Sequence, residues 1–89
     1  MSDFTDLIAR AVSPSMSRAE RDHVYGVIRQ AVVRLQEREA LAPDEPRVAL
    51  QRHLVEETIR DVEADIARFL ALEQMEKAAA AQAAENAPR

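Results

Sequence analysis

The sequence has no cysteine, only one glycine and only three aromatic residues among its 89 positions. Without cysteine there is no disulfide bond, no thiolate chemistry and no zinc site built from cysteine ligands. The single glycine, Gly26, leaves no glycine-rich loop that could bind phosphate. A chain without cysteine suits a reducing compartment, and we expect the protein in the cytoplasm.

The sequence also lacks a long apolar run. Its N-terminal segment carries Asp3 and Asp6 before any basic residue, so we expect neither a secretion signal nor a membrane span. The formal net charge is −4, and residues 48–77 hold seven acidic and four basic residues. Nucleic acid is a poor partner for such an acidic segment.

What the sequence has in abundance is good helix formers with helical periodicity. Between Pro46 and Lys77 the apolar residues alternate spacings of four and three, which is the pattern of a helix that packs along a seam. These residues are Val55, Ile59, Val62, Ile66 and Phe69. The pattern predicts an all-α fold organised around one long helix over residues 46–77.

Two further helices are predicted before it. Residues 3–12 place their apolar side chains on one helical face and are followed by Pro14, which ends the helix. A second helix over 17–40 begins with Ser17 and Glu20 at the spacing of a capping box. Because a short connection with two prolines separates it from the third helix, the two long helices should form an antiparallel hairpin.

The two long helices differ in length. The third should outlast the second by roughly two turns, and we expect the short N-terminal helix to fold over the uncovered end. That end carries Phe69, Leu70, Leu72 and Met75. Residues 78–89 are rich in alanine, so we expect a tail that extends the helix and then frays, leaving residues 1–77 as a single domain.

The periodicity assigns a core and leaves a surplus of apolar side chains. The predicted buried residues are Val24, Ile28, Leu35, Ile59, Val62, Ile66 and Phe69. The candidate interface residues, which one antiparallel neighbour cannot cover, are Tyr25, Gly26, Val32, Val33, Leu41, Leu50 and Leu54. A chain of this size buries a modest core, and in a two-fold dimer one patch serves both subunits. We therefore predict a homodimeric antiparallel four-helix bundle.

Two groups of titratable residues have the spacing of a metal site or a catalytic site but lack the other features that such a site needs. Glu20 and His23 match the Glu-x-x-His spacing of carboxylate-bridged di-metal bundles, but there is no second such motif, and a solvated first helical turn is the simpler interpretation. His53 is close in sequence to Glu56 and Glu57, but a helix surface offers no pocket for acid–base catalysis. We expect no metal, no cofactor and no enzymatic activity.

The second predicted helix is locally basic. Its arginines alternate with acids, and the simpler interpretation is charge matching against the acidic third helix. They are Arg18, Arg21, Arg29, Arg34 and Arg38. The sequence favours protein–protein interaction, by a self-associating module or a small adaptor. The alternative is a regulatory protein that binds nucleic acid through these arginines.

The hairpin resembles a helical segment common near the N-terminus of alphaproteobacterial proteins of unknown function. In that pattern, Leu-Ile-x-x-Ala-Val-x-Pro precedes an Arg-x-x-Val-Tyr helix and then a Leu-x-x-x-Ile-x-x-Val-Glu helix. The matching residues are Leu7, Ile8, Ala11, Val12, Pro14, Arg21, Val24, Tyr25, Val55, Ile59, Val62 and Glu63, with Val55 in place of the leucine. The resemblance covers most of residues 7–63 and implies an association module, without any activity or binding residue.

Overall fold

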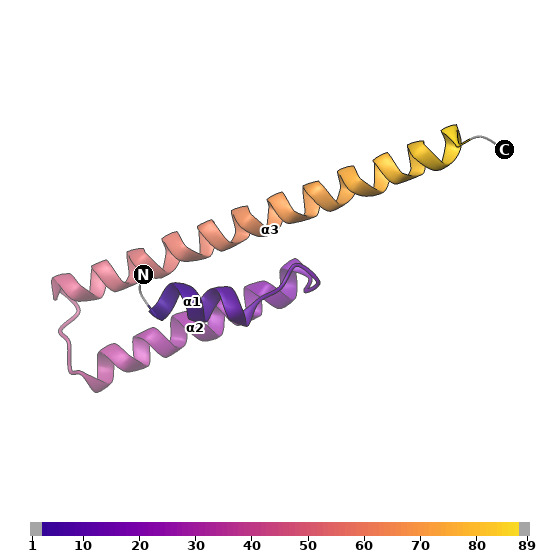
Figure 1. The fold of residues 1–89 in the computed structure, drawn as a ribbon. Helices are drawn as coiled ribbons and strands as arrows, with labels where there is room; N and C mark the ends of the chain where they lie inside the picture. Colours follow the sequence, from indigo (N-terminus) through magenta and orange to yellow (C-terminus); the bar gives the residue numbers. More distant parts are fainter. Residues whose placement is uncertain (1–2, 88–89) are drawn as a thin grey trace.

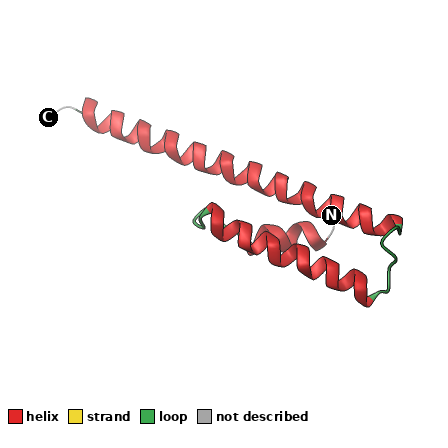
Figure 2. Cartoon of the chain, turned by 180° about the vertical axis from the view of Figure 1, so that it is seen from behind, coloured by secondary structure: helices red, strands yellow, loops and turns green. Residues whose placement is uncertain are grey.

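The computed structural model describes residues 3–87, which form three α-helices joined by short loops (Figure 1). The helices are α1 (Asp3–Ala11), α2 (Arg18–Arg38) and α3 (Pro46–Asn86), and this range contains no strand. α2 and α3 run antiparallel as a hairpin (Figure 2). The predicted all-α fold is confirmed. None of the described helices is long and apolar enough to cross a membrane.

Local signals set the start of α2. Ser17 Oγ accepts a hydrogen bond from the Glu20 amide at 3.1 Å, and the Ser17 amide donates to Glu20 Oε1 at 2.9 Å. The predicted capping box is therefore present. Just before it, the chain reverses in a turn in which the Met16 amide donates to the Ser13 carbonyl at 3.1 Å.

The end of α2 is a left-handed turn of the Schellman type. Ala40 has a φ of 54°, and the Leu41 amide donates to the Gln36 carbonyl at 3.0 Å. An alanine in this conformation costs about 1 to 2 kcal/mol, because its Cβ crowds the backbone. The turn ends α2 at Arg38, slightly before the predicted end near Ala40.

α3 is much longer than the helix it pairs with. It has 41 residues and α2 has 21, because the alanine-rich residues 78–86 continue the helix beyond Lys77. The molecule is therefore elongated, at 71 × 21 × 17 Å with a radius of gyration of 19.1 Å, where a compact chain of this length would have about 12 Å. The C-terminal part of α3 extends past the start of α2 (Figure 1). Residues 88 and 89 of the predicted tail lie outside the described range.

The core lies where α1 covers the hairpin. It comprises Ile8, Val12, Tyr25, Val32, Val55, Ile59 and Ile66. Of the predicted core residues, Ile59 and Ile66 are buried, while Val24, Ile28 and Val62 are partly buried against this cluster. The predicted burial of Leu35 and Phe69 is wrong, because these side chains are 39% and 52% exposed.

The position of α1 explains why Phe69 is exposed. The sequence led us to expect α1 over the far end of α3, but the turn at Ser13–Met16 directs it back along the hairpin, against both α2 and α3 (Figures 1 and 2). Ile8, with 0% exposure, anchors it there. The end of α3 therefore stays uncovered by α1.

Candidate interaction surface

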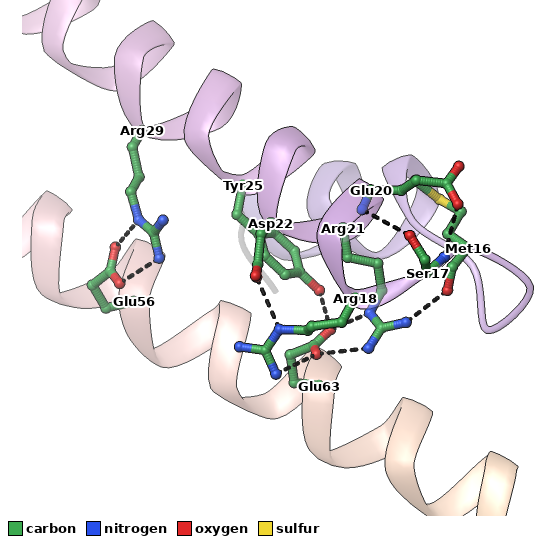
Figure 3. A network of polar contacts seen from close by, with 10 residues as sticks. All are labelled: Met16, Ser17, Arg18, Glu20, Arg21, Asp22, Tyr25, Arg29, Glu56 and Glu63. Atoms are coloured by element: carbon green, nitrogen blue, oxygen red, sulfur yellow. Dashed lines mark hydrogen bonds and ion pairs between the residues drawn. The ribbon is translucent and has the colours of Figure 1, made fainter.

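One carboxylate gathers the polar contacts between α2 and α3 (Figure 3). Glu63 accepts hydrogen bonds from Arg21 Nε at 2.8 Å, from Arg21 Nη2 at 3.1 Å and from the Tyr25 hydroxyl at 2.5 Å. Arg18 adds an ion pair with Glu63 at 3.2 Å. Arg21 also donates to the Met16 carbonyl at 2.8 Å, which ties the preceding loop to the same point. We call these residues the Glu63 network.

Burial and neighbouring charges fix the protonation states in the Glu63 network. Tyr25 is 1% exposed, and burial, together with the hydrogen bond to the Glu63 carboxylate, raises the pKa of its hydroxyl to about 12. The hydrogen bonds from Arg21 lower the pKa of the Glu63 carboxyl. Near neutral pH the network therefore joins an ionised carboxylate, charged guanidinium groups and a neutral phenol. Every buried polar side-chain atom among the described residues has a partner, and the network joins α2 to α3.

A second ion pair joins the hairpin nearer its loop. Arg29 Nε and Nη2 donate to the Glu56 carboxylate at 2.7 and 2.9 Å. Together with the two arginines of the Glu63 network, this accounts for three of the five arginines on α2. Their pairing agrees with the predicted charge matching. Arg34 and Arg38 form no ion pair with any side chain that the structure describes.

The candidate ligand groups are dispersed. Glu20 is occupied by the capping box, and His23 on the same turn is exposed. His53 Nε2 lies 3.4 Å from the Glu57 carboxylate on an exposed face, while Glu56 is bound by Arg29. Among the described residues, no three His, Cys, Asp or Glu side chains gather in a way that could hold a metal ion.

Two parts of the remaining surface are apolar, and the first part is a groove between α1 and α2. The groove has a volume of about 490 Å³ and is lined by Leu7, Ile8, Ile28, Ala31, Val32 and Leu35. Leu7 is 66% exposed and Leu35 is 39% exposed, so its walls are open to solvent. Arg34 and Arg38 also line it. We call this hollow the α1–α2 groove.

The second part is the end of α3 after Ile66, the last buried residue of the helix. Residues 69–86, which we call the α3 arm, carry large apolar side chains that no other element of the described range covers. They are Phe69, Leu70, Leu72 and Met75, which are 52%, 39%, 59% and 66% exposed. A run of such residues on an uncovered helix marks an interaction site more often than scattered surface leucines do.

The predicted interface residues divide into two groups. Tyr25 and Val32 were expected at an interface, but they are 1% and 6% exposed and belong to the core of the chain itself. Val32 belongs to the buried cluster that includes Ile8 of α1. The Tyr25 hydroxyl is bound by Glu63 in the Glu63 network. The remainder stay accessible: Val33, Leu50 and Leu54 are 41%, 56% and 48% exposed, and Gly26 and Leu41 are partly buried.

Gly26 has open space around it. A Cβ added there would meet nothing within 4 Å apart from the helix itself and its chain neighbours. Within residues 3–87, therefore, no close helix crossing explains the glycine. Val33 contributes to a smaller hollow of about 270 Å³ between α2 and α3, which Leu50 and Leu54 do not line. The structure thus does not gather the predicted interface residues into one patch.

Sequence reasoning missed two features. The Glu63 network has a weak local signal, because Arg21 and Tyr25 lie four residues apart on one helical face, but their partner is 38 residues beyond Tyr25. The α1–α2 groove depends on where α1 docks, and residue spacing does not determine that position.

No known protein family, no curated protein and no solved structure matches the chain.

Proposed function

We propose that the chain is a non-enzymatic protein–protein interaction module that associates with itself as a homodimer. The observation that carries the proposal is the α3 arm, a long helical segment with exposed Phe69, Leu70, Leu72 and Met75 that no other described part of the chain covers. In proteins most of the stability of a helix comes from packing its apolar face against another surface. A second copy supplies that surface without requiring any other partner.

The size of the core supports the same proposal. The buried cluster holds seven side chains, of which Tyr25 and Ile8 are the largest that are fully buried. A core of this size contributes only a few kcal/mol of net stability, and small domains commonly add to it by oligomerising. In the dimer we propose, the long helices of the two copies form an antiparallel bundle with four helices in cross-section. We place this dimer in the cytoplasm, because a chain without cysteine suits a reducing compartment.

Sedimentation equilibrium and light scattering over a wide concentration range test the proposal. We expect twice the chain mass of 10.0 kDa at micromolar concentration. A chain that stays at its monomer mass at the highest soluble concentration would refute self-association.

The Arg side of α2 gives a weaker case for the alternative, a regulatory nucleic-acid-binding protein. Carboxylates already bind Arg18, Arg21 and Arg29, which leaves Arg34 and Arg38 to contact phosphates. Two such contacts give weak binding that falls steeply with salt. Retention of random DNA by the native protein, lost as salt rises, would favour this function, whereas no retention at low salt would dismiss it.

A further inference from the structure

We propose that the two copies of the dimer meet through their α3 arms, which pack antiparallel about a two-fold axis at Leu72. This inference rests on the proposed self-association and names the surface that makes it. Three observations carry it: a second exposed face on α3, a pattern of residues on that face that is symmetric about Leu72, and the length of α3 beyond the start of α2.

The second face lies about a third of a turn around α3 from the seam. Leu72 is six residues beyond Ile66, the last buried residue of the helix, and six residues make about one and two-thirds turns. The residues that share this face are spaced by three and four and are all exposed. They are Asp61, Asp65, Arg68, Leu72, Glu76, Ala79 and Ala83. We call this surface the Leu72 face. α3 can therefore hold its own α1 and α2 on the seam and a second copy on the Leu72 face.

The residues around Leu72 are arranged symmetrically along the chain. Arg68 and Glu76 lie four residues before and after it, and Phe69 and Met75 lie three residues before and after it. An antiparallel two-fold axis at Leu72 pairs each residue with the one equally far on the other side. Arg68 of one copy then comes to the level of Glu76 of the other, and Phe69 to the level of Met75. Leu72 meets its own copy on the axis.

The paired side chains are chemically complementary. Phe69, Leu72 and Met75 are three of the four large apolar side chains that the arm exposes. Packed helices lie about 8–10 Å apart, so these side chains can meet, and a methionine sulfur against an aromatic ring is a favourable contact. Among the described residues, Glu76 has no ion pair and Arg68 has one, with the exposed Asp65 of its own helix. Two Arg68–Glu76 pairs would thus border an apolar centre, as is typical of protein interfaces.

The charges also decide the direction of the two helices. In a parallel pair aligned residue for residue, Asp65, Arg68 and Glu76 would each face their own copy. Like charges that face each other across an interface are destabilising. In the antiparallel pair, Asp65 instead faces Ala79, whose small side chain allows a close approach. The Leu72 face therefore favours the antiparallel arrangement.

The arm is long enough to keep the α1–α2 layers of the two copies apart. The ion pairs between α2 and α3 place Arg18, the first residue of α2, at about the level of Ala67 on α3. The axis at Leu72 is five residues further along, or about 7.5 Å, where α3 has passed the start of α2 (Figure 1). The α2 helices of the two copies then begin about 15 Å apart along α3, which leaves room for both Ser13–Met16 turns.

The same axis gives the alanine-rich end of α3 a position in the dimer. Asn86 of one copy reaches about the level of Thr58 on α3 of the other. Residues 78–86 therefore lie along residues 58–66 of the second copy. A section through these levels cuts α1, α2 and α3 of one copy and the arm of the other, which makes four helices. This agrees with the bundle that we propose above.

The first experiment measures the dimer dissociation constant of full-length variants by sedimentation equilibrium, with circular dichroism to confirm that each remains helical. We expect Leu72→Glu to raise the constant about 100-fold, because it brings two carboxylates together in the apolar centre. Gln74→Glu is the matched control. It adds the same charge two residues further along the arm, on nearly the opposite face, and should leave the constant unchanged.

A charge exchange tests the two polar pairs by the same measurement. Arg68→Glu and Glu76→Arg should each weaken the dimer about tenfold, because each places like charges opposite one another twice in the dimer. The variant with both changes restores opposite charges at the same levels, so its dissociation constant should return to near the native value. If the double variant is as weak as the single variants, these residues do not face each other.

The second experiment uses the absence of cysteine in the chain. Leu72→Cys lies on the axis, so on oxidation it should form a disulfide-linked dimer at protein concentrations well above the dissociation constant. Asp65 and Ala79 are 14 residues apart, or about 21 Å along one helix, and the axis brings each to the level of the other in the second copy. The double variant Asp65→Cys with Ala79→Cys should therefore form a covalent dimer, and neither single variant should.

The outcomes separate the two proposals. A native chain that is monomeric refutes both. A native dimer that survives Leu72→Glu, or that weakens equally with Gln74→Glu, keeps self-association and overturns the contact at Leu72. A disulfide formed by Asp65→Cys alone would show a parallel pair, which overturns the antiparallel arrangement. Dissociation by Val33→Glu or Leu54→Glu, with no effect of Leu72→Glu, overturns it too and moves the interface to the hairpin flank.

Discussion

Replacing Glu63 with glutamine removes the charge at the centre of the Glu63 network and preserves the side-chain volume. Three hydrogen bonds from Arg21 and Tyr25, at 2.8, 3.1 and 2.5 Å, end on this carboxylate. Glutamine has one acceptor oxygen, and its amide would face a second donor. Hydrogen bonds to a charged group contribute about 1.5–3 kcal/mol each, and one of the three can persist on the glutamine oxygen.

The solvent reduces this loss but does not remove it. The Glu63 side chain is 15% exposed, so water screens part of the interaction, and we expect Glu63→Gln to lower the free energy of unfolding by about 2–3 kcal/mol. For a domain of this size the melting temperature should fall by about 10 to 20 °C. Urea unfolding followed by far-ultraviolet circular dichroism, at one fixed protein concentration, measures the change.

Asp65→Asn is the matched control, because Asp65 lies on the same helix with its side chain 72% exposed and bonds only to Arg68 among the described residues. It should change the free energy of unfolding by about 0.5 kcal/mol or less. The lowered pKa of Glu63 means that its contribution is present above its ordinary pKa of 4.5 and is lost as the pH falls through the folded value. The native protein and the variant should therefore converge in acid. Equal effects of the two substitutions at neutral pH would refute this account of the network.

Three other predictions concern single positions. Tyr25 is the only tyrosine and the chain has no tryptophan, so its absorbance should titrate near pH 12 in the folded protein and near pH 10 in urea. Because the pKa is higher in the folded protein, the stabilising contribution of Tyr25 is full below pH 10 and is lost as the pH rises toward 12. A midpoint near pH 10 in the folded protein would contradict the burial of Tyr25. Gly26→Ala should stabilise the chain by about 1 kcal/mol in urea unfolding, since an added Cβ meets nothing within 4 Å; destabilisation with a weaker dimer would instead place a close helix crossing there. Ile66→Ala should cost about 2 to 5 kcal/mol by the same assay, because its side chain is 7% exposed in the core, and a cost within about 0.5 kcal/mol would show that the seam of α3 is assigned wrongly.

The sequence was sufficient for the parts of the fold that local chemistry decides. The capping box at Ser17 and Glu20 marked the start of α2, and the apolar spacing of four and three marked the seam of α3. The end of α3 was harder to place, because an alanine-rich segment has helix propensity without a periodic stripe. Propensity alone does not indicate whether such a segment stays helical to Asn86 or frays near Lys77.

Residue spacing could not predict how segments that are distant in the sequence pack against one another. The direction of α1 depends on the turn at Ser13–Met16 and on where Ile8 finds a buried position, so the prediction that α1 covers Phe69 was wrong. Tyr25 was assigned to a surplus surface because its hydroxyl partner, Glu63, is remote in sequence. An aromatic residue beside a seam can be interface or core, and only the partner of its polar group decides between them.

The ion pair of Arg29 with Glu56 also determines which alignments of the hairpin are allowed. Arg52 and Arg60 lie one helical turn before and after Glu56. If α2 slid along α3 by one turn in either direction, Arg29 would meet another arginine, and Arg21 would face Ile59 or Ala67 in place of a carboxylate. Both shifts exchange an attraction for a repulsion and leave a guanidinium beside an apolar side chain. The ion pairs thus favour a single alignment of α2 along α3. The apolar residues alone would pack almost equally well after a shift of one turn.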